Sequence, residues 1–177
     1  MKWPSEPSGP EPDDTPPADA YEVARAIALR HLDRRDLTAE ELRSRLVVKG
    51  VGDEIADAVV FRFIEAGLLD DRRYALRYAE SRQSSRSVSR AVVRRELQRK
   101  GVDPDLVDEA ASGLDDESEY RTAREFAERR ARSLSRHPRE VQYRRLGGAL
   151  ARKGFPPSLV HRVLGEVLGT SDSDTSW

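Results

Sequence analysis

Apolar residues recur along this chain in a six-residue pattern that is found three times. The pattern is Leu, two further residues, Lys, Gly and an apolar residue, and its copies are 46–51, 97–102 and 150–155. The repeat anchors are Leu46, Gly50, Leu97, Gly101, Leu150 and Gly154. The Lys-Gly steps are 51 and then 53 residues apart. Self-similarity at such a period is typical of a repeat array, so we predict three structural repeats.

The residues around each copy predict a helix, a stop and a second helix. An aliphatic residue stands four positions before each Leu, at Leu42, Val93 and Leu146, and residues four apart share one helix face. The Gly then ends the helix, because it readily adopts the left-handed conformation that caps the last carbonyls. In the first copy, Thr38 and Glu41 have the spacing of a capping box, which predicts the start of the helix.

Capping signals, glycines and prolines divide the body of the chain into nine expected helices. They form three groups of three, over 21–69, 70–114 and 115–169, and no segment shows the alternation of a strand. The first helix is expected to direct Val23 and Ile27 to the core. We therefore predict an all-α fold of three tandem three-helix repeats in an elongated, solenoid-like array, in which neighbouring units stack and share their cores.

The two ends of the chain differ from its body. Residues 1–20 contain six prolines, five acids and no aliphatic residue larger than Ala, which predicts a disordered, Pro-rich acidic tail. Residues 170–177 are polar and acidic in the same way. The tails carry charges of −4 and −2, so the total of −1 leaves +5 on 21–169. A basic body suggests an anionic partner.

The residue types exclude several kinds of chemistry. The chain has no Cys, so disulfides, thiolate metal sites and Cys nucleophiles are excluded. None of its three His residues has a second His or a carboxylate at ligand spacing. The Lys-Gly steps have the reverse order of a phosphate-binding loop. We predict no catalytic site, metal or cofactor and, because no signal sequence or membrane-spanning run is visible, a cytoplasmic protein.

Arginines are concentrated in the middle of the chain and supply the candidate partner-binding residues. These are Arg72, Arg73, Arg77, Arg82, Arg86, Arg90, Arg94, Arg95 and Arg99. Between Arg82 and Arg99 only Glu96 is negative, and a surface of one sign suits a phosphate backbone or an acidic protein surface. The alternative is a solvated helix face. Because Arg90 and Arg94 lie opposite the apolar arc, reversing their charge is expected to leave stability nearly unchanged.

One succession of motifs resembles the central signature of the RecX family. It consists of Gly-Leu-Leu-Asp-Asp-Arg-Arg-Tyr-Ala at 67–75, Ser81-Arg82, and Arg-Glu-Leu-Gln-Arg-Lys-Gly-Val at 95–102. The resemblance covers 21–169 and is loosest in the third unit, where Gly147-Gly148 and Pro156-Pro157 depart from it. It implies an elongated array of three-helix units. It also implies a regulator that binds the RecA filament on single-stranded DNA and inhibits strand exchange and ATP hydrolysis.

Two functions of different classes follow. The first is a negative regulator of RecA, acting in DNA repair and recombination as a monomer with weak direct DNA contact. The second is a sequence-indifferent helical DNA-binding module, which would bind DNA without a protein partner and with a steep salt dependence. An enzyme is not expected.

Overall fold

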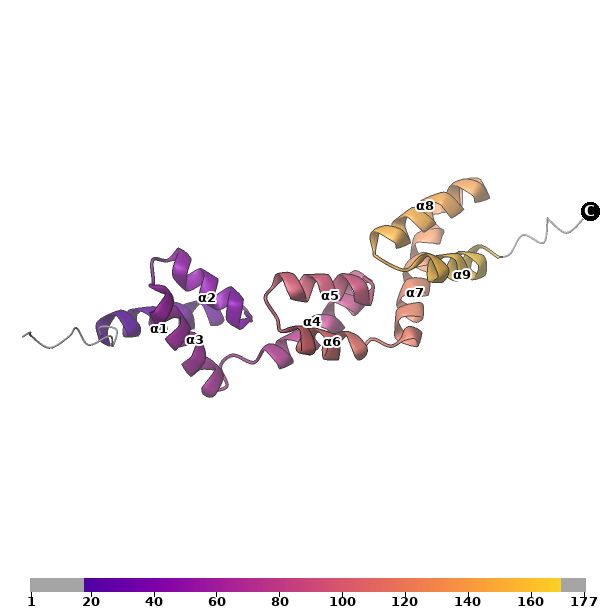
Figure 1. Ribbon diagram of the computed structural model, residues 1–177. Coiled ribbons are helices and arrows are strands. Elements are labelled where there is room, and N and C mark those ends of the chain that lie inside the picture. The colour runs from indigo at the N-terminus through magenta and orange to yellow at the C-terminus, as the bar shows by residue number, and fades with distance from the viewer. Residues whose placement is uncertain (1–17, 170–177) are drawn as a thin grey trace, which may run out of the picture.

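The protein is described by a computed structural model that covers residues 18–169. Within that range the chain forms nine α-helices and no strand, in three successive three-helix units that make an elongated array (Figure 1). The first unit contains α1 (Ala18–Leu32), α2 (Ala39–Val48) and α3 (Asp53–Glu65). The second contains α4 (Asp71–Arg86), α5 (Arg90–Arg99) and α6 (Pro104–Ser112), and the third α7 (Asp116–Leu134), α8 (Arg139–Arg152) and α9 (Pro157–Leu168). The predicted all-α repeat fold is confirmed.

The limits of the elements follow from local capping. Thr38 and Glu41 form the capping box in front of α2, and the Asp70 side chain accepts a hydrogen bond from the first turn of α4. Pro104 opens α6, where the missing N–H costs nothing. The helix α1 begins at Ala18, three residues before the first predicted unit. Residues 1–17 and 170–177 of the predicted tails lie outside the described range.

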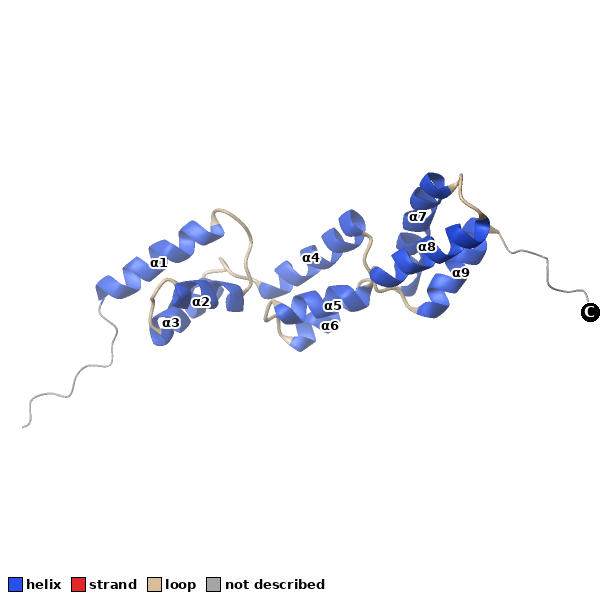
Figure 2. Cartoon of the chain, turned by 90° about the horizontal axis from the view of Figure 1, so that it is seen from above, coloured by secondary structure: helices blue, strands red, loops and turns tan. Residues whose placement is uncertain are grey.

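Each unit has a hydrophobic core of its own. The buried residues of the three clusters come from 24–69, 75–114 and 123–164 respectively, and the extensive helix packing is within units. Leu46, Leu97 and Leu150 are fully buried, one in each cluster. Seen from above, the three helix groups are separate bodies joined end to end (Figure 2). The expectation that neighbouring units share their cores is therefore wrong.

Two positions show how close packing selects small residues. In α1, Ala24 and Ala28 are buried, whereas Val23 is 59% exposed, so the expected core position of Val23 is wrong. In α8, a Cβ on Gly147 would lie 3.3 Å from the Leu164 side chain. The glycine thus allows α8 to approach α9 closely, which accounts for its place inside a helix.

Candidate partner-binding surface

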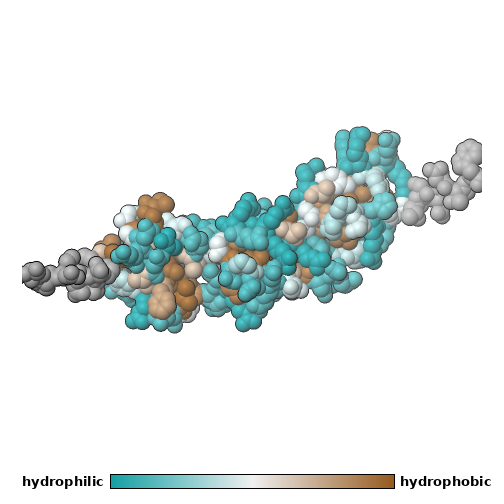
Figure 3. Space-filling model, in the orientation of Figure 1, coloured by the Kyte–Doolittle hydropathy of each residue, from teal (hydrophilic) through white to brown (hydrophobic). Residues whose placement is uncertain are grey.

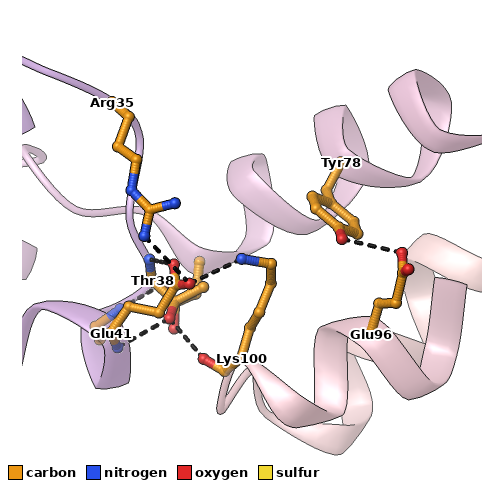
Figure 4. A network of polar contacts seen from close by, with 8 residues as sticks. Arg35, Thr38, Glu41, Tyr78, Glu96 and Lys100 are labelled. Carbon is orange, nitrogen blue, oxygen red and sulfur yellow. Dashed lines mark hydrogen bonds and ion pairs between the residues drawn. The ribbon is translucent and has the colours of Figure 1, made fainter. Parts of the chain in front are cut away.

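Two polar joints connect the units, and the first joins α2 to the end of α5. The Thr38 hydroxyl donates to the Lys100 carbonyl oxygen at 2.6 Å, and the Lys100 ammonium donates to Glu41 at 2.8 Å (Figure 4). Asp71, at the start of α4, accepts from the backbone N–H of Ala39 at 2.9 Å. The second unit therefore satisfies the Ala39 N–H in the first turn of α2, a donor that has no partner inside its own helix.

The second joint repeats this arrangement one unit further on. The backbone N–H of Ser89 donates to the Lys153 carbonyl oxygen at 3.0 Å, and the Lys153 ammonium donates to the Arg86 carbonyl oxygen. Glu119 of α7 accepts from the backbone N–H of Arg90 at 3.0 Å. Both joints have the same parts. Each forms at the start of the second helix of one unit, which is contacted by the Lys-Gly end of the second helix of the next unit. An acid of that next unit accepts a backbone hydrogen bond there.

The glycines of the two joints are needed for their conformation and for the contact. Gly50, Gly101 and Gly154 all have a positive φ, as predicted for helix-ending glycines. A Cβ on Gly101 would lie 2.4 Å from Glu40 Cβ, and one on Gly154 would lie 2.4 Å from Val92 Cγ2. A Cβ on Gly50 would meet nothing within 4 Å, because Gly50 stands at the outer end of the array.

This difference makes Gly101→Ala and Gly50→Ala a matched pair. Both variants place a side chain in the left-handed conformation, at a cost of about 1–2 kcal/mol. Only Gly101→Ala also forces the first unit away from the second. We expect a larger loss of melting temperature for Gly101→Ala and, in small-angle X-ray scattering, a changed radius of gyration for that variant alone. Equal melting and scattering of the two variants would show that the joint tolerates displacement.

Behind the first joint, a partly buried polar network ties α4 to α5. Glu96 accepts from the Tyr78 hydroxyl at 3.0 Å (Figure 4). It also forms an ion pair with Arg82. The Lys100 ammonium lies 5.5 Å and 5.4 Å from the ring centroids of Tyr74 and Tyr78, a cation–π geometry. The hydrogen bond from Arg82 lowers the pKa of Glu96, although burial opposes it.

The lowered pKa of Glu96 predicts a pH dependence that Glu96→Gln should remove. A carboxyl whose pKa is lower in the folded state stabilises the fold above its ordinary pKa of 4.5 and loses that contribution as the pH falls through the lowered value. We expect the wild type to be more stable than Glu96→Gln at pH 7 by about 1–3 kcal/mol. Urea unfolding at intervals down to pH 3 should show this difference shrinking. A difference that stays constant to pH 3 would contradict the assignment.

Five of the nine candidate arginines have acidic partners that are distant in sequence. The pairs are Arg72 with Glu109, Arg77 with Asp36, Arg82 with Glu96, Arg90 with Asp116 and Glu119, and Arg94 with Asp108. The expectation of a one-sign surface between Arg82 and Arg99 is therefore wrong at Arg90 and Arg94, which pair with acids from other helices. Glu119 is only 4% exposed, so charge reversal at Arg90 should destabilise the second joint, contrary to the expectation from the sequence.

The other four arginines have no carboxylate partner within the described range. They are Arg73, Arg86, Arg95 and Arg99. Arg95 and Arg99 lie one turn apart on α5, and Arg86 lies beside the second joint. Arg73 lines a different hollow, between α4 and the end of α1. The structure thus brings three of the four toward one surface.

That surface is a row of three open hollows along α2, α5 and α8, here called the helix-two groove. The first, of about 470 Å³, is lined by His31, Glu40, Glu41, Ser44, Arg45, Val48, Lys49, Arg99 and Lys100. The second, of about 610 Å³, is lined by Val92, Arg95, Glu96, Gln98 and Arg99. The third, of about 570 Å³, is lined by Arg82, Arg86, Val88, Val92, Glu96, Phe126, Arg130, Ala149, Arg152 and Lys153. Consecutive hollows share lining residues, so the groove is continuous across both joints.

The groove is strongly cationic. Ten Lys and Arg side chains line it, against three carboxylates, and two of these carboxylates, Glu41 and Glu96, are held in ion pairs with Lys100 and Arg82. Six of these ten cations were not among the candidates from the sequence: Arg45, Lys49, Lys100, Arg130, Arg152 and Lys153. A signal was present, because Arg99 and Arg152 occupy the same repeat position, two residues before the Gly.

Other kinds of site are not indicated in residues 18–169. No group of three or more potential metal ligands is found among them. Two of the histidines contact single surface neighbours: His161 bonds Tyr143, and His137 bonds Arg145. No helix in the same range is long and apolar enough to cross a membrane.

Comparison with protein-family models assigns each unit separately. Residues 24–63 match the first three-helix domain of RecX, residues 70–110 the second, and residues 116–164 the third. The crystal structure of RecX from Lactobacillus salivarius superposes with a TM-score of 0.75, covering 85% of this chain and 97% of that one, at 20% sequence identity. At this level of identity, the superposition establishes the shared fold.

Relatives of higher identity extend over most of the chain. Regulatory protein RecX of Streptomyces coelicolor is 39% identical over 160 residues, which is 90% of this chain and 85% of the relative. Regulatory protein RecX of Thermobifida fusca is also 39% identical over 160 residues, or 90% and 86% of the two chains. With three matched domains in order and relatives of this identity, the chain belongs to the RecX family of regulatory proteins.

Proposed function

We propose that this protein is a negative regulator of the RecA recombinase, which binds the RecA filament on single-stranded DNA in the cytoplasm and inhibits ATP hydrolysis and strand exchange. Membership of a family of regulatory proteins supports a regulatory rather than a catalytic role. The observation that carries the proposal is the helix-two groove. It is cationic and crosses both joints, so an elongated monomer presents one binding surface along its length.

The groove chemistry fits a nucleoprotein filament. Such a filament offers both DNA phosphates and acidic protein side chains, and Arg can bind either group through two parallel hydrogen bonds. Arg95 and Arg99 are available for this role, because neither is held by a carboxylate in residues 18–169. A regulator bound across neighbouring recombinase subunits would restrain the movements that accompany ATP turnover, which is how binding would become inhibition.

The direct test adds substoichiometric protein to RecA that is hydrolysing ATP on single-stranded DNA. We expect hydrolysis to fall by more than the molar fraction of protein added, because one bound array would affect several subunits. Unchanged hydrolysis at equimolar protein would contradict the proposed function.

The cationic groove also favours a second candidate, a sequence-indifferent DNA-binding module. That function predicts tight binding of a labelled single-stranded oligonucleotide without RecA, with log affinity falling steeply as log salt rises. The regulator predicts weak binding of the oligonucleotide alone and tight binding of the RecA–DNA filament. Fluorescence anisotropy with both targets, at several salt concentrations, separates the two.

A further inference from the structure

The first hollow of the helix-two groove is both cationic and apolar. Arg45, Lys49 and Arg99 line it, and none of them has a carboxylate partner in the described part of the chain. Val48 also lines it and is 84% exposed. The equivalent position in the other two repeats, two residues before the Gly, is Arg99 or Arg152. The first repeat therefore presents an aliphatic side chain where the others present a charge.

The surroundings of His31 show that several cations lie close to this hollow. His31 lines it, and the pKa of His31 is lowered by burial and then by the nearby charges of Arg45, Arg34, Lys49 and Arg35. Glu40 and Glu41 also line the hollow, but Glu41 is held by Lys100, so the cations remain in excess and a bound anionic group stabilises them. The hollow therefore suits a ligand with carboxylates and some apolar surface.

Apolar side chains are exposed mainly on the first unit. Figure 3 shows brown surface gathered over that unit, at the indigo end of the array in Figure 1. Among residues 18–169, six of the eight exposed large hydrophobic residues belong to it: Val23, Val47, Val48, Phe61, Ile64 and Leu68. Apolar surface that is exposed mainly on one unit indicates that this unit makes a contact.

The segment that precedes α1 has the complementary chemistry. Residues 1–17 contain four carboxylates, Glu6, Glu11, Asp13 and Asp14, against the single side-chain cation Lys2, and they include Trp3. The C-terminal segment, 170–177, is a weaker candidate, because it has two acids and follows α9, at the opposite end of the array.

The N-terminal segment is long enough to reach the hollow. The helix α1 has 15 residues, so it places His31 about 20 Å from Ala18 at 1.5 Å per residue. An extended chain spans about 3.3 Å per residue, so Glu11 reaches about 23 Å from Ala18 and Glu6 about 40 Å. Tethering also raises the local concentration of the segment to the millimolar range, which makes weak contacts effective.

We propose that the acidic segment 1–17 binds in the first hollow of the helix-two groove and competes there with the anionic partner. Its carboxylates pair with Arg45, Lys49 and Arg99, and its apolar residues cover Val48. The competing role rests on the proposed function, whereas the docking does not. The segment thus raises the partner concentration that is needed for binding, because the partner must displace it before it can occupy the whole groove.

Because the chain has no Cys, a single spin label can be placed in the full-length protein by Ser8→Cys. Paramagnetic broadening of amide NMR signals then locates the segment. We expect broadening over 41–49 and at Arg99 and Lys100 in low salt, with α8 and α9 unaffected. Broadening should disappear in 0.5 M salt, about where screening is complete within a few ångströms, and in the variant Glu6→Gln, Glu11→Gln, Asp13→Asn, Asp14→Asn.

A matched control neutralises the other end of the chain by Asp172→Asn and Asp174→Asn, which should change nothing. Broadening confined to the first turn of α1, or unaffected by neutralising the four N-terminal acids, would overturn the docking. A mixture of spin-labelled protein and isotope-labelled protein without Cys gives broadening only by contact between molecules. Broadening of equal strength there would assign the hollow to a second copy and overturn the proposal.

The competing role is tested in a separate experiment, which measures inhibition of RecA. Neutralising the four N-terminal acids should lower the concentration needed for half-inhibition of RecA about threefold or more, and neutralising the C-terminal acids should not. If neither protein inhibits RecA, the proposed function fails and the NMR result still decides the docking. If both inhibit equally well while docking is seen, the segment does not compete.

Discussion

Leu97→Ala is expected to lower the unfolding free energy of the second unit by about 2–5 kcal/mol, the usual cost of truncating a fully buried Leu. Leu97 is 0% exposed in a cluster that contains only residues of that unit. Because the joints on either side are polar and local, the damage should stay largely inside the unit. Native-state hydrogen exchange should therefore show reduced protection in α4–α6 and much smaller changes in α1–α3 and α7–α9.

The matched control for this prediction is Leu76→Ala, which removes the same atoms from the same unit. Leu76 is 37% exposed, so its truncation should cost clearly less. If Leu97→Ala lowers protection equally in all three units, the joints couple the units energetically, and the separation of the cores does not govern unfolding.

The fold was predictable because its determinants are local and occur three times. Leu97 recurs as Leu46 and Leu150 at one period, and each is followed by a glycine that ends the helix. Caps such as Thr38 also act within a few residues. Such signals agree with one another along the sequence, which is what makes a repeat fold recognisable.

The core of α1 and the joints were not predictable in the same way. Val23 has the side chain of a core residue, but α1 approaches its neighbours so closely that Ala24 and Ala28 fill the interface. The contact of Lys100 with Thr38 spans 62 residues. The hydrophobic periodicity within one unit does not predict which residues contact the next unit.

The candidate surface was predicted only in part, because the order of charges along the sequence does not show which arginines and acids pair in the fold. Arg90 and Arg94 follow a stretch without acids, yet Asp116 and Asp108 reach them from later helices. Arg152 lines the groove but belongs to a different unit from the arginine-rich stretch, so its position in the sequence does not point to this surface. In the folded chain, acids from other helices pair with some of the candidate arginines, and cations from other units line the groove.

The second prediction concerns the arginines that remain available. Changing Arg95 and Arg99 to Glu together should raise the concentration needed for half-inhibition of RecA about tenfold or more. Two attractions become two repulsions, each on the order of 1 kcal/mol even in water. Neither side chain holds a carboxylate or fills a core within the described residues, so the melting temperature should hardly change. Steady-state ATPase assays and thermal unfolding measure the two effects.

The matched control is a double charge reversal on a different surface, Arg121→Glu with Arg132→Glu. Both residues are exposed on α7 and are not part of the groove lining. The change of net charge is the same, so a specific surface predicts that this variant inhibits almost as well as the wild type. An equal loss of inhibition in the two variants would show that only the net charge of the protein matters.

Under the proposed function, the helix-two groove is the surface that meets the filament. Figure 1 shows α2, α5 and α8 on one side of the array and α3, α6 and α9 on the other. Hydrogen–deuterium exchange of the protein, free and bound to RecA on single-stranded DNA, reads the two sides separately. We predict protection of α2, α5, α8 and the two joints on binding, with little change in α3, α6 and α9. Protection confined to α3, α6 and α9 would show that the filament binds the opposite side of the array and not the helix-two groove.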